Sequence, residues 1–355
     1  MIDLNKVMEQ FEIEAKLVPY GNGHINDTYR IEASKCILQR INTKIFKNPE
    51  ELMENIENVT TFLRAKIMQT GGNPDRETLT VVKTKDGKNC YRYNDENVFR
   101  VYKFIENTKS IEFEKTNEAL CQAGIGFGRF QKMLADFPVE KLHETIVDFH
   151  NTPKRVEALK QAIKEDKAGR KALVESEIRF ALDCAGFANT VIEKLEKGSI
   201  PYRVTHNDTK INNILFDEKT GEAVCVIDLD TVMPGSMLYD FGDALRMGAS
   251  TAAEDEVDLD KVWFDTVAFK AFTKGYLSEM KDSLVSNEIA LLPFAVKLMT
   301  YECGIRFLTD YLNGDTYFKI HREHHNLERA RNQFKLVADI AAKEDELRKI
   351  CMEML

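Results

Sequence analysis

The spacing of apolar residues changes near residue 107, and this change constrains the fold of the chain most strongly. Before it, short strand-like runs alternate with turns, and one long helical pattern begins at Asn48-Pro49. After it, most segments have the helical period, apart from residues 201–230. This order predicts a two-lobed α+β protein, with a small antiparallel β-sheet lobe over residues 1–107 and a larger, mainly helical lobe over residues 108–355.

The small lobe is expected to hold a sheet of about five strands. Residues 78–84 and 89–93 are strand-like and flank Asp86-Gly87, which is typical of a hairpin turn. Residues 98–104 are expected to form the neighbouring strand. The sequence therefore predicts that the first two runs pair with each other.

The break in the helical pattern carries the polar residues on which the prediction of function depends. His206, Asp208 and Asn213 lie in VTHNDTKINN, and Asp228 follows two apolar runs separated by a turn. We expect these runs to form a hairpin that brings Asn213 and Asp228 together, with Asp208 in the preceding loop. A carboxylate can accept a hydroxyl proton, and Mg²⁺ prefers amide and carboxylate oxygens as ligands.

This arrangement predicts phosphoryl transfer to a hydroxyl group, with Asp208 as general base and Asn213 and Asp228 as magnesium ligands. Each residue alone could equally cap a turn or a strand end, and the spacing of all three indicates the catalytic role. His206 and Asp240 are expected to support the catalytic loop without direct chemistry. Asp240 is also placed to cap the next helix.

Six stretches of the chain resemble a known family: PYGNGHINDTY, ILQRIN, RVYKFIENT, IPYRVTHNDTKINNILFD, VIDLDTVMPGSMLYDFGDALRMGAS and ECGIRFLTDYLNGDTYF. They are similar to the aminoglycoside phosphotransferase and choline kinase-like family and, within it, to the bacterial N-acetylhexosamine 1-kinases. The resemblance implies a protein-kinase-like fold and an ATP- and Mg²⁺-dependent kinase. It also implies phosphorylation of the anomeric hydroxyl of N-acetylglucosamine or N-acetylgalactosamine, giving N-acetylhexosamine 1-phosphate. The sugar contacts that it implies are His24, Asp230, Arg306 and Tyr317.

Fewer residues indicate where the nucleotide binds. Gly21 and Gly23 lie in a turn, where glycine lets the backbone approach a phosphate closely, although plain hairpin turns use glycine as well. Gln39 stands where the family usually carries a strand lysine, and Asn26 stands where protein kinases carry a third glycine. By fold analogy, adenine is expected to bind backbone groups of the connector between the lobes. This connector is Phe104-Ile105-Glu106-Asn107, of which Phe104, Ile105 and Glu106 are expected to contact the nucleotide.

A second glycine-rich stretch, Gly124 to Gly128, resembles a phosphate-binding loop but is flanked by residues with the helical period. We therefore expect a helix in which Gly124 and Gly128 share one face and allow close helix packing.

Composition narrows the class of protein. The chain has 355 residues and a formal net charge of -9, which argues against a nucleic-acid partner because phosphate binding needs clustered Lys and Arg. No apolar run reaches the roughly 18 residues of a membrane span, and the N-terminal residues lack the pattern of a signal peptide. The seven cysteines form no CxxC pair, so we expect reduced thiols in a cytoplasmic protein. We also expect a monomer.

Two alternatives remain open. One is a kinase of the same fold with another hydroxyl acceptor, such as homoserine, an amino alcohol or an aminoglycoside. Arg306 and Arg322 stand beside only a few acidic residues, which suits a neutral sugar better. The other alternative is a catalytically silent nucleotide-binding protein, which the missing strand lysine favours.

Overall fold

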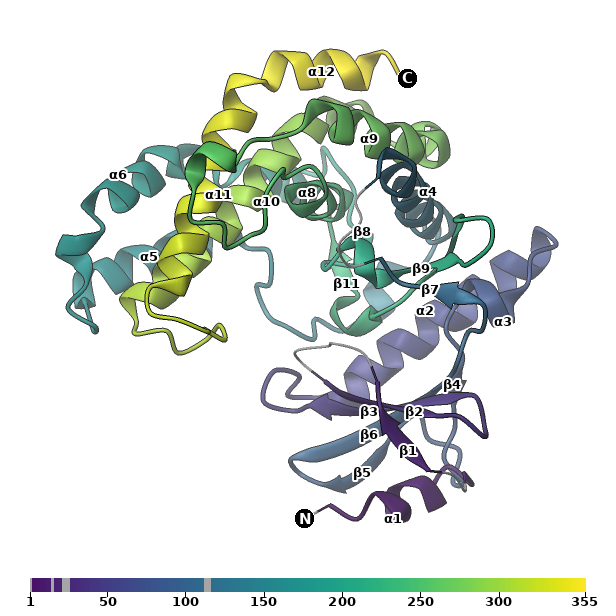
Figure 1. Cartoon of the computed structure of the whole chain (residues 1–355). Coiled ribbons are helices and arrows are strands. Elements are labelled where there is room, and N and C mark those ends of the chain that lie inside the picture. The colour runs from purple at the N-terminus through teal and green to yellow at the C-terminus, as the bar shows by residue number, and fades with distance from the viewer. Residues whose placement is uncertain (1, 14–15, 21–25, 112–115) are drawn as a thin grey trace. The chain divides into compact units, whose positions relative to one another are not determined.

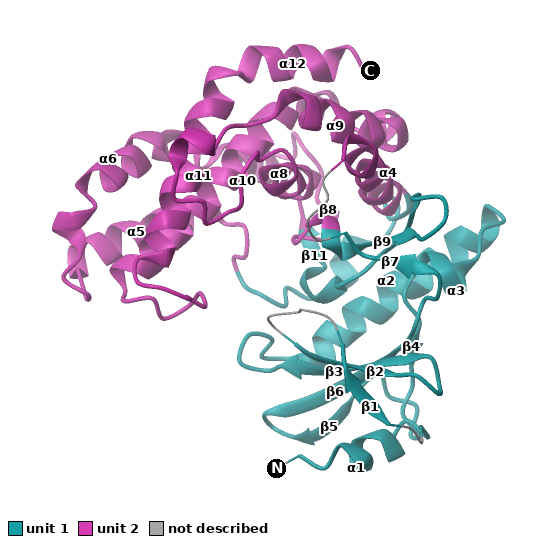
Figure 2. Cartoon of the chain, viewed as in Figure 1, with its two compact units in different colours: residues 1–111, 133–147, 212–234 teal, residues 112–132, 148–211, 235–355 magenta. Residues whose placement is uncertain are grey.

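The structure is a computed structural model that describes residues 2–13, 16–20, 26–111 and 116–355. The chain packs into two compact units, which are coloured separately in Figure 2. Unit 1 comprises residues 1–111, 133–147 and 212–234, and unit 2 comprises residues 112–132, 148–211 and 235–355. This grouping reflects which residues pack together. The division into a nucleotide lobe and a sugar lobe at residue 107 stays a prediction.

The α+β class predicted from the sequence is confirmed. Unit 1 contains an antiparallel sheet of order β1-β2-β3-β6-β4, in which β5 also pairs with β6 (Figure 1). Its strands are β1 (Leu17–Pro19), β2 (Asp27–Ile31), β3 (Cys36–Asn42), β4 (Val81–Val82), β5 (Tyr91–Asn94) and β6 (Asn97–Lys103). A short helix, α1 (Leu4–Glu9), packs Val7 and Met8 into one apolar cluster with Leu38 of β3.

The strand β6 is the partner of three others, and this makes the predicted hairpin pairing wrong. All of β6 except Lys103 is buried, and one of its edges pairs with β3 along its whole length. Its other edge pairs with β4 at one end and with β5 at the other. The runs around Asp86-Gly87 therefore both pair with β6, because this almost fully buried strand offers each of them more apolar surface than they offer each other.

The long helix predicted for unit 1 is confirmed as α2 (Pro49–Gln69), which α3 (Pro74–Glu77) follows. Its apolar residues at helical spacing are all buried: Leu52, Ile56, Val59, Leu63 and Ile67. Asn48 makes no capping bond to the backbone, since its side-chain amide donates to Oε2 of Glu51 at 3.0 Å. The helix start therefore depends on Pro49 and the acidic first turn rather than on a side-chain cap.

Two small sheets account for the remaining strands. The first has the order β10-β9-β7 and lies in unit 1. Its members are β7 (Thr108–Lys109), β9 (Ile214–Asp217) and β10 (Ala223–Val226). In the second, β8 (Arg203–Thr205) pairs with β11 (Met233–Gly235). These sheets carry the segment in which the catalytic residues are predicted.

Helices build unit 2 around α10, which Figure 1 shows among α5, α8 and α11. The apolar core here joins residues of α5, α6, α10 and α11. The helices are α4 (Asn117–Met133), α5 (Thr152–Glu165), α6 (Glu175–Cys184), α7 (Thr190–Glu196), α8 (Met237–Gly248), α9 (Thr266–Met280), α10 (Ser286–Leu312), α11 (His325–Ala342) and α12 (Glu344–Met352). Over the described residues, none of the helices is both long enough and apolar enough to cross a membrane.

The glycine-rich stretch lies inside α4, as predicted, and brings α4 against α9. A Cβ atom at Gly124 would lie 2.2 Å from the carbonyl oxygen of Phe272. On the facing helix, a Cβ atom at Gly275 would lie 1.9 Å from the carbonyl oxygen of Cys121. Glycine is therefore required on both sides of this contact, and the stretch is not a phosphate-binding loop.

Candidate active site

The hairpin predicted between Asn213 and Asp228 is present in unit 1. Strand β9 pairs with β10 so that Ile214 faces Val226, and the backbone N–H of Ile227 donates to the carbonyl oxygen of Asn213 at 2.9 Å. Asn213 ends a short 3₁₀ turn and is buried, while Asp228 follows β10 and is exposed. The hairpin thus keeps an amide and a carboxylate at the same end of two paired strands.

The backbone at Asp228 has an unusual conformation. Its φ of 59° and ψ of 56° are left-handed, which few residues other than glycine adopt. Strained backbone of this kind is often found at functional sites. Among the described residues no three His, Cys, Asp or Glu side chains gather as a metal site. One amide and one carboxylate nevertheless fit Mg²⁺, which commonly takes one or two carboxylates and completes its shell with water and phosphate.

Asp230 lies two residues further on and is held by a buried ion pair. Its Oδ1 lies 2.5 Å from Nη1 of Arg100, and the side chains of Arg100 and Asp230 are only 1% and 5% exposed. Its Oδ2 accepts a hydrogen bond from the side-chain amide of Asn26 at 2.7 Å. Both carboxylate oxygens therefore have partners within unit 1, and the sugar contact suggested for Asp230 stays a prediction.

Arg100 stands directly across β3–β6 from Gln39. The two residues are register partners, and Nε of Arg100 donates to the amide oxygen of Gln39 at 3.0 Å. Burial works to lower the pKa of Arg100, but neighbouring Asp230 outweighs it, so the pKa lies above its ordinary value. Where the sequence lacks a strand lysine at Gln39, the structure places a buried cation on the adjacent strand.

The loop that carries Asp208 belongs to unit 2 and is anchored by Asp240. The backbone N–H groups of His206 and Asn207 donate to Oδ2 and Oδ1 of Asp240, at 2.8 and 2.7 Å. Burial raises the pKa of Asp240 against the opposing influence of His206. Asp240 lies within α8 and does not cap it, because Ser236 makes the capping bond to the N–H of Leu238. The predicted capping role is wrong, whereas the contact with the catalytic loop is present.

His206 and Lys210 lie on either side of Asp208. The ring of His206 is buried and meets the rings of Phe127 and Phe130 edge to face. Nζ of Lys210 lies 2.8 Å from Oδ1 of Asp208, whose charge raises the pKa of the lysine. The proposed base thus has a positive charge beside it, which favours its ionised form.

Of the three described residues implied as sugar contacts, Arg306 and Tyr317 lie near each other in unit 2. Arg306 covers the rings of Phe149 and Phe318, and Tyr317 meets Phe318 edge to face with centroids 4.8 Å apart. The side chain of Tyr317 is 66% exposed. Asp310 holds this loop, since its carboxylate accepts from the backbone N–H groups of residues 316, 317 and 318.

The structure describes only some of the residues that are predicted to bind the nucleotide. Gly21 and Gly23 lie outside the described residues, and so does His24, for which a sugar contact is predicted. In the connector, the backbone N–H of Phe104 donates to the carbonyl oxygen of Lys35 at 2.8 Å. The carbonyl oxygen of Glu106 accepts a hydrogen bond from Nη1 of Arg76 at 2.7 Å. The carbonyl of Ile105 accepts from Thr108 at 2.7 Å. These backbone groups are engaged within unit 1, and adenine binding here stays a prediction.

Sequence reasoning missed two charged residues of this region, Arg100 and Lys210. Arg100 interrupts the apolar run VFRVYKF, and a charge at a buried strand position needs a partner. Lys210 follows Asp208 by two residues. The position of each residue in the sequence indicates that its charge has a partner, but it does not identify that partner.

Comparison with known proteins assigns the fold and the family. Residues 16–262, more than half of the chain, match the model of the phosphotransferase enzyme family. The chain belongs to this family. It is therefore a small-molecule kinase of the aminoglycoside phosphotransferase and choline kinase-like type, as the resemblance implied.

Solved structures share the fold at low sequence identity. An aminoglycoside phosphotransferase from Alicyclobacillus acidocaldarius matches with a TM-score of 0.65 at 13% identity, over 99% of this chain and 97% of that chain. An amicoumacin kinase in complex with AMP-PNP, Ca²⁺ and Ami matches with a TM-score of 0.61 at 15% identity, over 96% and 94%. A microcompartment-associated aminopropanol kinase matches with a TM-score of 0.59 at 16% identity, over 97% of both chains.

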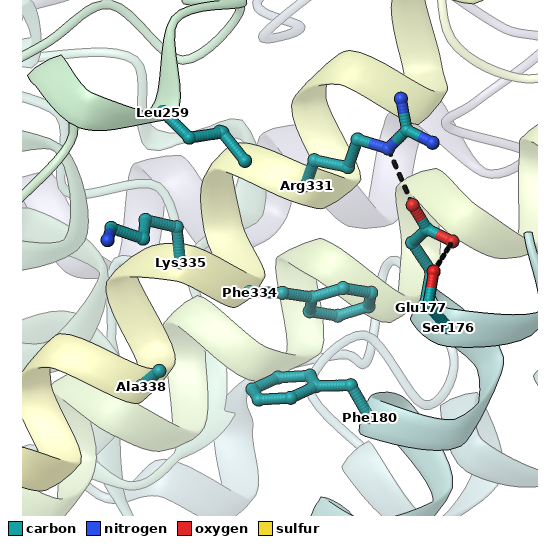
Figure 3. A pocket seen from close by; sticks show the side chains of 8 residues that line it. All are labelled: Ser176, Glu177, Phe180, Leu259, Arg331, Phe334, Lys335 and Ala338. Atoms are coloured by element: carbon teal, nitrogen blue, oxygen red, sulfur yellow. Dashed lines mark hydrogen bonds and ion pairs between the residues drawn. The ribbon is translucent and has the colours of Figure 1, made fainter.

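An open apolar pocket lies elsewhere in unit 2, along α6 and α11 (Figure 3). Its polar edge holds an ion pair in which Nε of Arg331 lies 2.5 Å from Oε1 of Glu177. The residues that line it are Ser176, Glu177, Phe180, Leu259, Arg331, Phe334, Lys335 and Ala338. None of them is a residue for which a catalytic, nucleotide or sugar role is predicted.

Proposed function

We propose that the chain transfers the γ-phosphoryl group of ATP to the anomeric hydroxyl of N-acetylglucosamine or N-acetylgalactosamine. The observation that carries the proposal is the β9–β10 hairpin, which keeps Asn213 and Asp228 together directly after the loop that bears Asp208. Membership of the phosphotransferase family supports the reaction. The choice of acceptor and of the anomeric hydroxyl rests on the sequence resemblance.

Asp208 is the general base in this proposal. Its carboxylate accepts the proton of the anomeric hydroxyl as the phosphoryl group arrives, and Lys210 forms an ion pair with this carboxylate in the structure. Asp240 fixes the backbone on the N-terminal side of Asp208, so that the base does not have to be ordered in each turnover.

Asn213 and Asp228 hold Mg²⁺ in this proposal, and the ion would offset negative charge on the phosphates. The amicoumacin kinase of the same fold, described in complex with AMP-PNP and Ca²⁺, supports a nucleotide and a divalent cation in such a protein. Gly21, Gly23, Gln39 and the connector from Phe104 to Glu106 would bind the nucleotide. His24, Asp230, Arg306 and Tyr317 would bind the sugar.

The test is a panel of acceptors given to the purified chain with ATP and Mg²⁺, with release of ADP as the signal. N-acetylglucosamine and N-acetylgalactosamine are expected to be turned over, and ³¹P NMR should place the phosphate on carbon 1. The methyl glycoside of N-acetylglucosamine, which lacks a free anomeric hydroxyl, is the control and should release no ADP. Turnover of homoserine, an amino alcohol or an aminoglycoside, but of neither sugar, would refute the proposed acceptor.

A further inference from the structure

Two arginines of unit 2 converge on Phe149. Arg155 lies on α5 and donates from Nη2 to the carbonyl oxygen of Phe149 at 2.9 Å. Arg306 lies on α10, and its Cζ is 5.6 Å from the centroid of the Phe149 ring. The helices α5 and α10 pack directly against each other. Arg155 thus lies beside one of the residues that the sequence resemblance assigns to the acceptor.

Neither arginine has an ion-pair partner within the described part of the chain. The Nε of Arg155 is buried there and has no hydrogen-bond acceptor. Burial lowers the pKa of Arg155, and the positive charge of Arg306 adds to this effect. Glu302 opposes this effect, and the phenol of Tyr317 and the carboxylate of Asp148 oppose it as well. Arg155 therefore shares one charged neighbourhood with both Arg306 and Tyr317.

The acidic side chains nearest to this pair are engaged elsewhere. Glu302 accepts from Nδ1 of His150 at 2.8 Å and from the hydroxyl of Thr152 at 2.6 Å. Asp148 pairs with Lys154 at 2.6 Å. Glu302 and Asp148 therefore offset part of the charge of the arginine pair, but among the described residues neither carboxylate forms an ion pair with either arginine.

A buried donor without an acceptor destabilises the fold, and a neighbouring positive charge adds to this cost. Buried donors without an acceptor are few in native proteins, and a functional role is one explanation for such a group. The planar guanidinium group has several N–H donors in a fixed fork, and it matches the oxygen of an amide carbonyl or a carboxylate. The pair is thus suited to a ligand group that offers oxygen acceptors.

We propose that Arg155 is a further acceptor-binding residue, and that Arg155 and Arg306 together select acceptors whose substituents carry oxygen acceptors and no positive charge. This proposal rests on the proposed function and deepens it. An N-acyl group supplies a carbonyl oxygen to the pair, whereas a protonated amine in the same place meets two like charges. Amino alcohols and aminoglycosides, the acceptor types named for two proteins of the same fold, are disfavoured here.

The experiment compares N-acetylglucosamine with glucosamine, at a pH where the amine of glucosamine is protonated. The wild-type chain is expected to use N-acetylglucosamine with a kcat/KM at least about tenfold higher, since tenfold corresponds to about 1.4 kcal/mol. Arg155→Gln should raise KM for N-acetylglucosamine and so lower kcat/KM by about tenfold. It should also reduce the ratio of kcat/KM for N-acetylglucosamine to that for glucosamine. Arg155→Lys should retain the discrimination against glucosamine, because it retains the charge.

The matched control is Arg179→Gln, which removes one positive charge from an exposed position of α6 in the same unit. It should change neither acceptor's kinetics. The inference would be overturned if Arg155→Gln kept the wild-type melting temperature and the wild-type ratio of kcat/KM for N-acetylglucosamine to that for glucosamine. It would also be overturned if the wild-type chain preferred glucosamine.

Failure of the proposed function gives a different result. If only a non-sugar hydroxyl acceptor is turned over, the proposed function fails. If the acceptor that is turned over is cationic, the inference is refuted as well. If that acceptor is neutral or anionic and its KM is higher for Arg155→Gln than for the wild type, the inference is supported. If no acceptor releases ADP, the rise in melting temperature caused by N-acetylglucosamine decides. A smaller rise in Arg155→Gln than in the wild type supports the inference, and an equal or absent rise refutes it.

Discussion

The ion pair between Arg100 and Asp230 gives a prediction about stability whose size follows from its burial. Replacing Arg100 with Met keeps much of the apolar stem and leaves the carboxylate of Asp230 buried without its cation. Removing one partner of a buried pair typically costs about 3–5 kcal/mol. Because both side chains are almost fully buried, solvent screening does not reduce this value. For a unit of this size the loss corresponds to a fall in melting temperature of about 6–20 °C.

The assay is thermal unfolding of the whole chain followed by circular dichroism, with three variants. Arg100→Met alone should show the full loss. The double variant Arg100→Met with Asp230→Asn should recover part of it, because no unpaired charge is left in the interior. Arg92→Met, which breaks the exposed pair with Glu50, should cost less than about 1 kcal/mol. If Arg100→Met behaved like Arg92→Met, the reasoning would be refuted.

Three further predictions concern other parts of the chain. Gly124→Val should overpack the contact between α4 and α9 and cost about 1–3 kcal/mol in urea unfolding, whereas Gly186→Ala, at an open position, should cost much less; equal losses would contradict the packing argument. Burial tends to raise the pKa of Glu302, but His150 and Arg306 bring it below its ordinary value, so its contribution to stability is present above the ordinary pKa and is lost as the pH falls through the lowered pKa. Urea midpoints measured from pH 6 to pH 3 should therefore fall more steeply for the wild type than for Glu302→Gln, and parallel curves would count against this. Asp240→Asn should lower kcat at least about tenfold, since it replaces one of the two carboxylate oxygens that hold the catalytic loop; an unchanged kcat would show that the loop does not need this anchor.

The parts of the fold that could be predicted from the sequence depend on local patterns. The helical spacing of apolar residues gave α2, and the flanking helical period gave α4 despite its glycines. The hairpin between Asn213 and Asp228 also followed from neighbouring apolar runs and a turn. In each case the interactions that decide the structure lie within a short stretch of chain.

The parts that could not be predicted depend on residues far apart in the sequence. The pairing of β4 and β5 is decided by β6, which both strands contact and which is buried on both faces. Arg100 pairs with Asp230, 130 positions away, and no local pattern identifies such a partner. Arg155 was also overlooked, because an arginine in the first turns of an amphipathic helix has the sequence pattern of an exposed residue.

The most direct test is the rate of ADP release by Asp208→Asn with ATP, Mg²⁺ and N-acetylglucosamine. We expect a fall of roughly 10²–10⁴ in kcat, the range for a positioned base, with a melting temperature close to that of the wild type. Asp183→Asn removes an exposed carboxylate of α6 and is the matched control, with an expected rate close to that of the wild type. A rate for Asp208→Asn near that of the control would contradict the assignment of Asp208 as the base.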